Sequence, residues 1–557
     1  MKTNLRRMGV ILAVILALRF GTVFAAEMTV WTMLGSDRAQ PETPPNGQKA
    51  VSIQCARNEY EPFQVIVTAQ GGDVKVTGVE VSDLVADGGK TIPKSGITLY
   101  CEHFIEIKQP SYRCKTPPGW WPDALIPFVN PGDGTPLKNA RFVALPCEVK
   151  AGNNQPFWVD VFVPKDAGAG AYKGKVTVTA EGLAPAEAPV ELKVWDFALP
   201  DTPTVKSEFG GMGGTAAFHK MNPKDEAFRP IEMRYLEACA AHRITPQIPG
   251  YMRPKSNPDG TLDSSTTHAE LKAYIERLHV NAISVPFSAY KDPLKAGREL
   301  TKKYLDNYYQ YLKQSGWEKG NYIYILDEPN DEKAYEEVRQ RAAVAHEANK
   351  GLRVLCTEQT LGSDPKWGTL VGAVDIWVPL WPLHDEKTAA ERLAAGDELW
   401  SYTALCQGKP ESPFWETDFP ALNYRVPLWI NWRCHMTGLL YWSMVYWRGV
   451  QDMWTDAMTY LPKGAKSGYN GEGSLFYPGA DAGFDGPVAS IRLKNIREGM
   501  EDYEYMQMLS DLGERPFVDE LVRSVGRSWF DWEKDPAKLY AARAKLGERI
   551  AERKAAH

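Results

Sequence analysis

The feature that most constrains the fold is an alternation of short apolar runs with amphipathic stretches beyond residue 204. The apolar runs predict eight strands, over residues 205–209, 244–247, 282–286, 322–327, 353–356, 373–379, 399–404 and 438–444. Amphipathic stretches predict helices over 230–242, 268–278, 297–314, 332–349, 388–395 and 422–435. Such a series of strand–helix units over about 240 residues predicts a (β/α)8 TIM-like barrel. A doubly wound open sheet is the alternative, although no G-x-G-x-x-G motif follows a strand.

The segments on either side of this region differ from it. Residues 26–200 contain many short alternating runs separated by Gly and Pro turns, which predicts a β-sandwich. The Pro- and Trp-rich stretch 114–134 reads as a long loop within this domain. The barrel is expected over 204–512 and ends with a helix, 489–512, whose charges we expect to face solvent. Residues 513–557 predict a C-terminal helical extension, so the chain is multidomain, α/β plus all-β.

The amino terminus has the pattern of a secretory signal. Lys2, Arg6 and Arg7 precede the apolar run 8–18, and Ala25 closes a small-x-small cleavage site. A signal peptide over 1–25 predicts a secreted or periplasmic protein without a membrane association after its removal. No later apolar stretch reaches the length of about 20 residues that a transmembrane helix needs.

Composition excludes several classes of function. The net charge of −6 and the isoelectric point near 6.0 give no basic surface for nucleic acid. No pair of the 8 cysteines has CxxC spacing, so we expect neither a metal site nor another cofactor. Disulfides are possible in an exported protein, and Cys101 and Cys114 are close enough in sequence to form one.

The stretch NYIYILDEPND, residues 321–331, carries the strongest chemical signal. A buried fourth strand of the barrel runs directly into Asp327 and Glu328, and Pro329 then ends it. Charged side chains rarely follow a buried strand without a partner or a chemical role. In α/β barrels the carboxyl end of a strand is where catalytic groups lie. The two acids are therefore predicted to be the catalytic residues of a glycoside hydrolase. The alternative is that they cap the next helix or pair with a nearby Arg or Lys.

Other polar and aromatic residues are expected near the same end of the barrel. Aromatic rings stack on the apolar faces of sugars, so a pocket of carboxylates surrounded by Trp and Tyr suits a glycan. The predicted substrate-binding residues are Glu358, Trp381, Tyr402, Arg425, Trp442 and Tyr446. Glu416 and Asp418, in the loop after the seventh predicted strand, belong to the same predicted face.

Several longer motifs resemble glycoside hydrolase family 123. They are VWDFALP, GLLYWSMVYW, GEGSLFYPG, SIRLKNIREGMEDYEYM and RNEYEPFQVIV, together with the DEP strand end. The resemblance covers most of the chain after residue 25. It implies a catalytic barrel with an N-terminal β-sandwich, and hydrolysis of terminal β-linked N-acetylgalactosamine or a related 2-acetamido sugar.

The resemblance also implies a substrate-assisted retaining mechanism. Neighbouring acids at one strand end cannot easily flank a sugar as two separate carboxylates do. The 2-acetamido group of the substrate would instead act as the nucleophile. Glu328 would be the general acid and base, and Asp327 would orient the acetamido N–H. Two rivals stay open: a conventional glycosidase with Glu358 or Glu416 as nucleophile, and a non-catalytic carbohydrate-binding or scaffold protein. The exact sugar and aglycone, exo or endo action, oligomeric state, disulfide connectivity and glycan binding by the sandwich also stay open.

Overall fold

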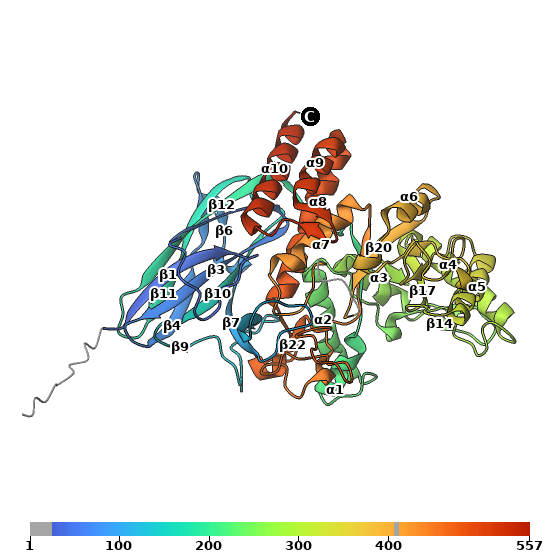
Figure 1. Cartoon of the computed structure of the whole chain (residues 1–557), viewed down its shortest axis with the longest axis horizontal. Coiled ribbons are helices and arrows are strands. Elements are labelled where there is room, and N and C mark those ends of the chain that lie inside the picture. The colour runs from blue at the N-terminus through green and yellow to red at the C-terminus, as the bar shows by residue number, and fades with distance from the viewer. Residues whose placement is uncertain (1–24, 406–411, 557) are drawn as a thin grey trace, which may run out of the picture.

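The computed structural model describes residues 25–405 and 412–556. The predicted signal peptide lies outside the described residues except for its last position, Ala25. Within the described ranges, no helix combines the length and the apolar character that a membrane span requires. Figure 1 shows a β-rich N-terminal part in blue, an α/β part in green and yellow, and C-terminal helices in red that stand between them.

The N-terminal part consists of two β-sheets, as predicted for an all-β region. Buried and exposed side chains alternate along residues 74–81, 170–180 and 186–198 of one sheet, whereas residues 59–70 and 154–163 of the other are buried along most of their length. One sheet has the strand order β1-β3-β10-β7-β8, and the other has the order β2-β12-β11-β4-β9 with β5 and β6 at its side. The larger strands are β1 Glu27–Leu34, β2 Val51–Arg57, β3 Glu59–Gln70, β4 Val74–Val81, β7 Ile97–Ile107, β8 Gly119–Pro127, β10 Asn154–Val163, β11 Gly170–Ala180 and β12 Ala186–Ala198. The short strands are β5 Leu84–Ala86, β6 Thr91–Ile92 and β9 Cys147–Val149.

The stretch 114–134 is not one long loop. It contains β8, which pairs antiparallel with β7 at the edge of its sheet. Pro122 is accommodated where the β7–β8 register shifts by one residue, a place where a missing N–H costs little. The predicted disulfide is also wrong: Cys114 Sγ lies 3.3 Å from the carbonyl oxygen of Asp418, and the thiol of Cys101 contacts Cys147. The seven cysteines in the described ranges are free thiols.

The central part forms a parallel sheet of seven strands in the order β13-β21-β20-β19-β18-β17-β16. The strands are β13 Lys206–Phe209, β16 Ile283–Ser284, β17 Asn321–Leu326, β18 Val354–Cys356, β19 Ile376–Trp377, β20 Glu398–Thr403 and β21 Gly438–Tyr441. The first strand in sequence pairs with the last, and the others follow in chain order. This winding lacks the reversal of strand order that defines a doubly wound sheet.

The predicted eight-stranded ladder is not closed in this structure. The segment 244–247 forms no strand, and it lies beside β13 through a bond from the Thr245 N–H to Ser207 Oγ of 2.8 Å. Thr245 Oγ1 also contacts the Asn281 side chain. Pro246 and Pro249 explain the difference, because proline cannot donate to a β-ladder. The sheet is therefore parallel and curved like part of a barrel, and it is open between its edge strands β13 and β16. Hydrogen bonds of Thr245 that involve side chains, and no backbone ladder, span this opening.

Helices cover the outer face of this sheet, and each predicted helix is present. In β17, Ile323 and Ile325 pack into the main core with Leu305 and Val338 from the helices, whereas Tyr322 faces the inner side. This alternation is the one expected for a strand with two buried faces. The helices are α1 Thr215–Phe218, α2 Arg229–Ala241, α3 His268–Leu278, α4 Arg298–Gln314, α5 Glu332–Ala348, α6 Glu386–Ala394, α7 Leu422–Arg433 and α8 Ile491–Leu509.

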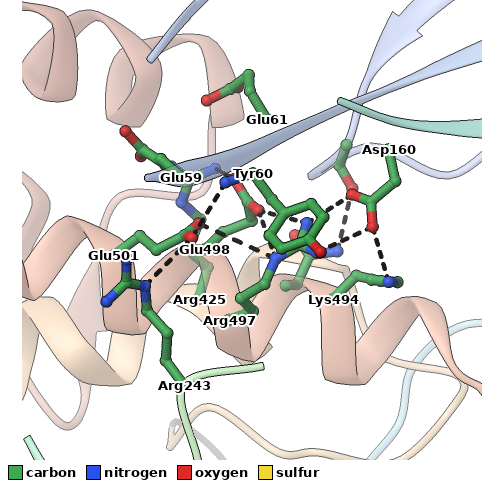
Figure 2. Close-up of polar contacts among 12 residues, drawn as sticks. Glu59, Tyr60, Glu61, Asp160, Arg243, Arg425, Lys494, Arg497, Glu498 and Glu501 are labelled. Carbon is green, nitrogen blue, oxygen red and sulfur yellow. Dashed lines mark hydrogen bonds and ion pairs between the residues drawn. The ribbon is translucent and has the colours of Figure 1, made fainter. Parts of the chain in front are cut away.

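Helix α8 is buried on nearly all sides, which contradicts the prediction that its charges face solvent. Its buried charged residues are Arg492, Lys494, Arg497, Glu498, Glu501, Asp502 and Glu504. The helix stands between the N-terminal sheets and α7, and the C-terminal helix α10 (Pro536–Ala555) packs against it. Buried charges need partners, and in α8 these partners come from elements distant in sequence, as Figure 2 shows.

Ion pairs join α8 to the sandwich and to the C-terminal extension. Asp160 in β10 accepts hydrogen bonds from Lys494 at 2.8 Å and from both terminal nitrogens of Arg497 at 2.7 and 2.9 Å. From α10, Arg543 pairs with Glu61 of β3 and Asp502 of α8, both at 2.9 Å. The predicted C-terminal extension is therefore a packed part of the fold. Helix α9 (Arg515–Val525), which follows α8 in the sequence, contacts both α8 and α10.

Candidate active site

The chain leaves the sheet at the carboxyl end of β17 with Asp327 and Glu328. Successive side chains of a strand point to opposite sides. Glu328 has a φ of +40°, in the left-handed region, and this turn interrupts the alternation. Both acids consequently line one cavity of about 390 Å³. The next helix, α5, is capped by a different residue, since Asp331 accepts a bond of 2.7 Å from the Ala334 N–H.

The carboxylate of Asp327 is held from one side. Tyr324 Oη donates to Asp327 Oδ1 at 2.7 Å, and Thr357 Oγ1 donates to the same oxygen at 2.9 Å. Burial, followed by the charge of Asp327, raises the pKa of Tyr324, so this hydroxyl stays a donor. Both bonds reach Oδ1 and fix the orientation of the carboxylate, and no described residue makes a hydrogen bond to Oδ2.

Glu328 is fixed through its backbone and its side chain. Its N–H donates to Thr357 Oγ1 at 2.9 Å, and its Oε1 accepts a bond of 2.6 Å from Tyr402 Oη. Tyr402 is a buried residue of β20 on the inner side of the sheet. The two acids are thus positioned by hydroxyl groups from three different strands or strand ends.

The other wall of the cavity includes Glu208 and Trp442. Glu208 in β13 accepts a bond of 2.7 Å from Gln247 Nε2 on Oε1, and Tyr322 Oη contacts its Oε2. Trp442 Nε1 donates to Glu472 at 2.5 Å. Gly210 lets the chain pass close to Trp442, because a Cβ there would lie 2.4 Å from the Trp442 carbonyl oxygen.

Sequence reasoning missed Glu208, Tyr324 and Glu472. For the first two a signal existed, since both lie near the carboxyl end of a predicted strand, as the predicted site residues do. Glu472 lies in a loop between β21 and β22 (Phe476–Pro478), where no periodic pattern marks it.

Two predicted site residues lie away from the cavity. Trp381 is fully buried and stacks on Trp529 with ring centroids 4.8 Å apart. Arg425 is fully buried in α7 and makes two hydrogen bonds to Asp502, at 2.7 and 2.8 Å. Both predictions of substrate contact are wrong in this structure, because each side chain is used in packing between elements.

Of the four remaining predicted residues, two line the cavity and two do not. Tyr402 and Trp442 line it, whereas Glu358 and Tyr446 do not. The Tyr446 ring packs against Trp442 with a centroid distance of 4.8 Å. Glu358 accepts a bond of 2.9 Å from Tyr335 Oη, and burial raises its pKa to about 7.

The loop acids Glu416 and Asp418 are also outside the cavity. Glu416 is buried, and burial together with neighbouring Glu472 raises its pKa well above the usual range. Asp418 accepts hydrogen bonds from the N–H and hydroxyl of Ser111, at 2.7 and 2.6 Å. In the described ranges no cluster of three or more His, Cys, Asp or Glu side chains is placed to hold a metal ion.

Two family models match the chain. The glycoside hydrolase 123 catalytic domain matches residues 227–509, slightly more than half of the chain, and the glycoside hydrolase 123 N-terminal domain matches residues 37–180. The chain belongs to glycoside hydrolase family 123. Family 123 membership confirms the resemblance that the sequence motifs indicate, and it makes glycosidic bond hydrolysis the supported activity.

Among solved structures, a family 123 enzyme shares the fold of this chain. A family 123 glycoside hydrolase from Clostridium perfringens, described for glycolipid glycan hydrolysis, is 14% identical with a TM-score of 0.63, covering 94% of this chain and 97% of that chain. A family 39 glycoside hydrolase from Bacteroides cellulosilyticus is 10% identical with a TM-score of 0.31, covering 81% and 82%. No match was found among curated protein sequences.

Proposed function

We propose that the protein hydrolyses terminal β-linked N-acetylgalactosamine, or a related 2-acetamido sugar, by a substrate-assisted retaining mechanism. The observation that carries the proposal is the position of Asp327 and Glu328 as successive residues on one cavity. A nucleophile and an acid that act from separate sides of the anomeric carbon require carboxyl groups about 5–5.5 Å apart, usually on different strands. Successive acids fit a reaction in which the substrate supplies the nucleophile.

The proposed first step breaks the glycosidic bond. The acetamido oxygen attacks the anomeric carbon and forms an oxazoline ring, while protonated Glu328 gives its proton to the leaving oxygen. Asp327 accepts the acetamido N–H on Oδ2, since Tyr324 and Thr357 already occupy Oδ1. The carboxylate thereby stabilises the positive charge that develops on the acetamido nitrogen.

The second step returns the enzyme to its starting state. Glu328, now ionised, takes a proton from a water molecule whose oxygen attacks the anomeric carbon. The oxazoline opens, the acetamido group is restored, and the sugar is released with its original configuration. Trp442 offers an apolar indole surface in the same cavity, suited to the apolar face of the sugar.

Nitrophenyl glycosides test the proposal directly. We expect turnover of the β-N-acetylgalactosaminide, and much less turnover of the matched β-galactoside, which lacks the nucleophile. Glu328→Gln and Asp327→Asn should each lower kcat by about 10²–10⁴-fold, the range for a lost acid–base group. Glu332→Gln is the matched control, because Glu332 is an exposed carboxylate at the start of α5. Wild-type rates in both active-site variants would contradict the assignment.

The conventional two-carboxylate mechanism remains the main rival, although its expected nucleophiles, Glu358 and Glu416, lie outside the cavity. Glu208 is the carboxylate on the other wall and would be the candidate in that case. A 2-fluoro sugar should label no carboxylate if the substrate assists, and a thiazoline sugar should inhibit tightly. A covalently labelled Glu208 would support the two-carboxylate mechanism. Failure to cleave any glycoside would instead favour a carbohydrate-binding protein.

Export is part of the same proposal. The charged and apolar segments before Ala25 support it. Expression of the full chain in a bacterium, followed by amino-terminal sequencing, should find a mature protein that begins near Ala26 outside the cytoplasm. A full-length cytoplasmic product would contradict it.

A further inference from the structure

A second and larger cavity lies between the N-terminal sheets and the catalytic domain. Its volume is about 590 Å³, and none of its lining residues lines the cavity of Asp327 and Glu328. The lining comes from β3, β7, β10 and the loop after β8 on one side, and from α2, α8 and the region of β22 and β23 (Pro487–Ala489) on the other. Ligand cavities commonly form at such domain interfaces and have volumes of about 300–1,000 Å³.

The charged residues of this cavity are unequal in number. Four cations line it, Lys94, Arg234, Lys494 and Arg497, against two acids, Asp160 and Glu237. Lys494 and Arg497 are buried, and both bind Asp160, as Figure 2 shows. Glu498, which does not line the cavity, also pairs with Arg497 at 3.0 Å, and burial raises the pKa of Glu498 to about 8. The local charge at neutral pH is therefore positive, which favours an anionic ligand.

The ammonium group of Lys494 has hydrogen-bond donors that no described residue uses. Its ammonium group is buried, and Asp160 is the only hydrogen-bond acceptor it has among the described residues. Its other close contact is the Tyr100 ring, at 5.1 Å from the centroid. An ammonium has three donors, so two of them remain for a ligand in the cavity.

His242 adds an unpartnered acceptor. The residue is 5% exposed and lines the cavity from the end of α2. Its Nδ1 lies 2.6 Å from the Ala238 carbonyl oxygen, and its Nε2 has no hydrogen-bond partner among the described residues. Burial and the charges of Lys494 and Arg497 lower the pKa of His242. The neutral ring must carry its proton on Nδ1, so Nε2 can accept a bond from a hydroxyl group.

The walls are apolar and partly aromatic. Phe128, Phe484 and Pro487 face the cavity together with Tyr100. A ligand that satisfies all of these groups needs an apolar face, hydroxyl groups and a negative charge, within the size of one or two sugar rings. Neutral sugars lack the anion, and inorganic anions lack the apolar face and the hydroxyl donor.

We propose that this interdomain cavity binds an acidic sugar, whose carboxylate or sulfate group contacts Lys494 and whose hydroxyl groups reach His242. This second site is separate from the hydrolytic site and extends the proposed function. It gives the enzyme a way to hold a glycan that carries an acidic residue.

Calorimetric titration of the Glu328→Gln variant tests the site without turnover. The probes are methyl β-glucuronide, methyl β-galactoside 6-sulfate and neutral methyl β-galactoside, all of which lack the acetamido group that the hydrolytic site is proposed to bind. We expect at least one acidic probe to bind at least tenfold more tightly than the neutral sugar, and the identity of that probe tells carboxylate from sulfate. Lys494→Met added to this background should weaken the acidic probe at least tenfold, and Arg497 still pairs with Asp160 there. Lys313→Met, an exposed lysine of α4, is the control.

A second variant keeps the test independent of the buried charges. Ala241 is exposed and lines the cavity from α2, so Ala241→Trp should fill the opening and abolish acidic-sugar binding while the fold is retained. No saturable binding of either acidic probe, equal affinity for the neutral sugar, or unchanged binding in Ala241→Trp would overturn the proposal. Because the background is inactive, failure here is distinguishable from failure to hydrolyse N-acetylgalactosaminides.

Discussion

At the scale of single residues, the left-handed turn at Glu328 lets two neighbouring acids share one cavity. A regular strand would have sent Asp327 and Glu328 to opposite faces of the sheet. Hydroxyl groups then set their orientation, Tyr324 and Thr357 for the first acid and Tyr402 for the second. Pre-set orientation of this kind is what lets a small site act without large rearrangement.

The bond from Tyr402 to Glu328 gives a direct prediction. Glu328 becomes charged as it gives its proton to the leaving oxygen, and a hydrogen bond to a charged group contributes about 1.5–3 kcal/mol, which corresponds to roughly 10–150-fold in rate. Tyr402→Phe should therefore lower kcat/KM on a nitrophenyl N-acetylgalactosaminide by about that factor without unfolding the protein. Tyr335→Phe, which loses a bond to Glu358 outside the cavity, is the comparison variant. Equal rates in Tyr402→Phe and the native enzyme would exclude a positioning role for this hydroxyl.

Trp442 depends on a buried acid behind it. Glu472 accepts the indole N–H, and burial raises its pKa to about 7. Glu472→Gln keeps an acceptor at this place, whereas Glu472→Leu removes it and leaves the indole N–H unpaired. We expect the Gln variant to stay near native KM and the Leu variant to raise KM about tenfold, the effect of about 1.4 kcal/mol in binding. Steady-state kinetics compares the two, and identical KM values would show that the indole needs no anchor.

At the scale of elements, α8 is a charged helix inside the protein. Glu61 of β3 and Glu498 have pKa values raised to about 8 mainly by burial, and Glu501 has a pKa raised to about 7 for the same main reason. Between the ordinary glutamate pKa of about 4.3 and these values, the folded protein binds more protons than the unfolded chain. Stability therefore falls as pH rises through this interval. Asp160 has a lowered pKa, and its contribution is lost only in acid.

This fall in stability with rising pH predicts a change in the melting temperature. The melting temperature should be higher near pH 5.5 than near pH 8.5, because ionising these buried glutamates costs free energy. Calorimetric scans at several pH values measure how steeply the melting temperature falls with pH. Glu498→Gln should flatten it, since an amide does not titrate, while Glu347→Gln on the exposed face of α5 should leave it unchanged. A melting temperature that rises steadily from pH 5.5 to 8.5 would contradict the assignment.

The elements also mark how far sequence reasoning reaches. Period-two and amphipathic patterns predicted seven strands of the central sheet and its helices, because those patterns report which faces are buried. They failed at 244–247, where Pro246 and the nearby Pro249 prevent a ladder, and at α8, whose buried charges find partners hundreds of residues away. Trp381 and Arg425 were misplaced for the same reason, since nothing local distinguishes a packing contact from a ligand contact. Asp327 and Glu328 could be placed together at the end of a strand from the sequence, because that signal is local.

At the scale of the whole molecule, the sandwich and the catalytic domain are joined by buried charge. Asp160 belongs to β10, and its two cationic partners belong to α8. From the other side, α10 reaches back to β3 through Arg543 and Glu61. The interface is therefore a permanent part of the fold, and relative domain motion is not expected there.

Asp160→Asn measures this connection. The change removes the carboxylate that binds both Lys494 and Arg497, and removing one partner of a buried ion pair costs about 3–5 kcal/mol. We expect a matching loss in the free energy of unfolding by urea. Asp196→Asn is the control, since Asp196 is 78% exposed in its pair with Arg57 and should have little effect. Similar stability losses in the two variants would mean that the Asp160 contacts are not specific.

The ion pairs between the two domains also constrain how a gene of this kind can evolve by recombination. A recombination event between residues 200 and 204 would bring together a sandwich and a catalytic domain from different ancestors. Unless the incoming sandwich carried an acid at the place of Asp160, the hybrid would bury the Lys494 ammonium without its carboxylate partner. Selection would remove most such hybrids, so the two modules should be inherited together and should diverge in step along this seam.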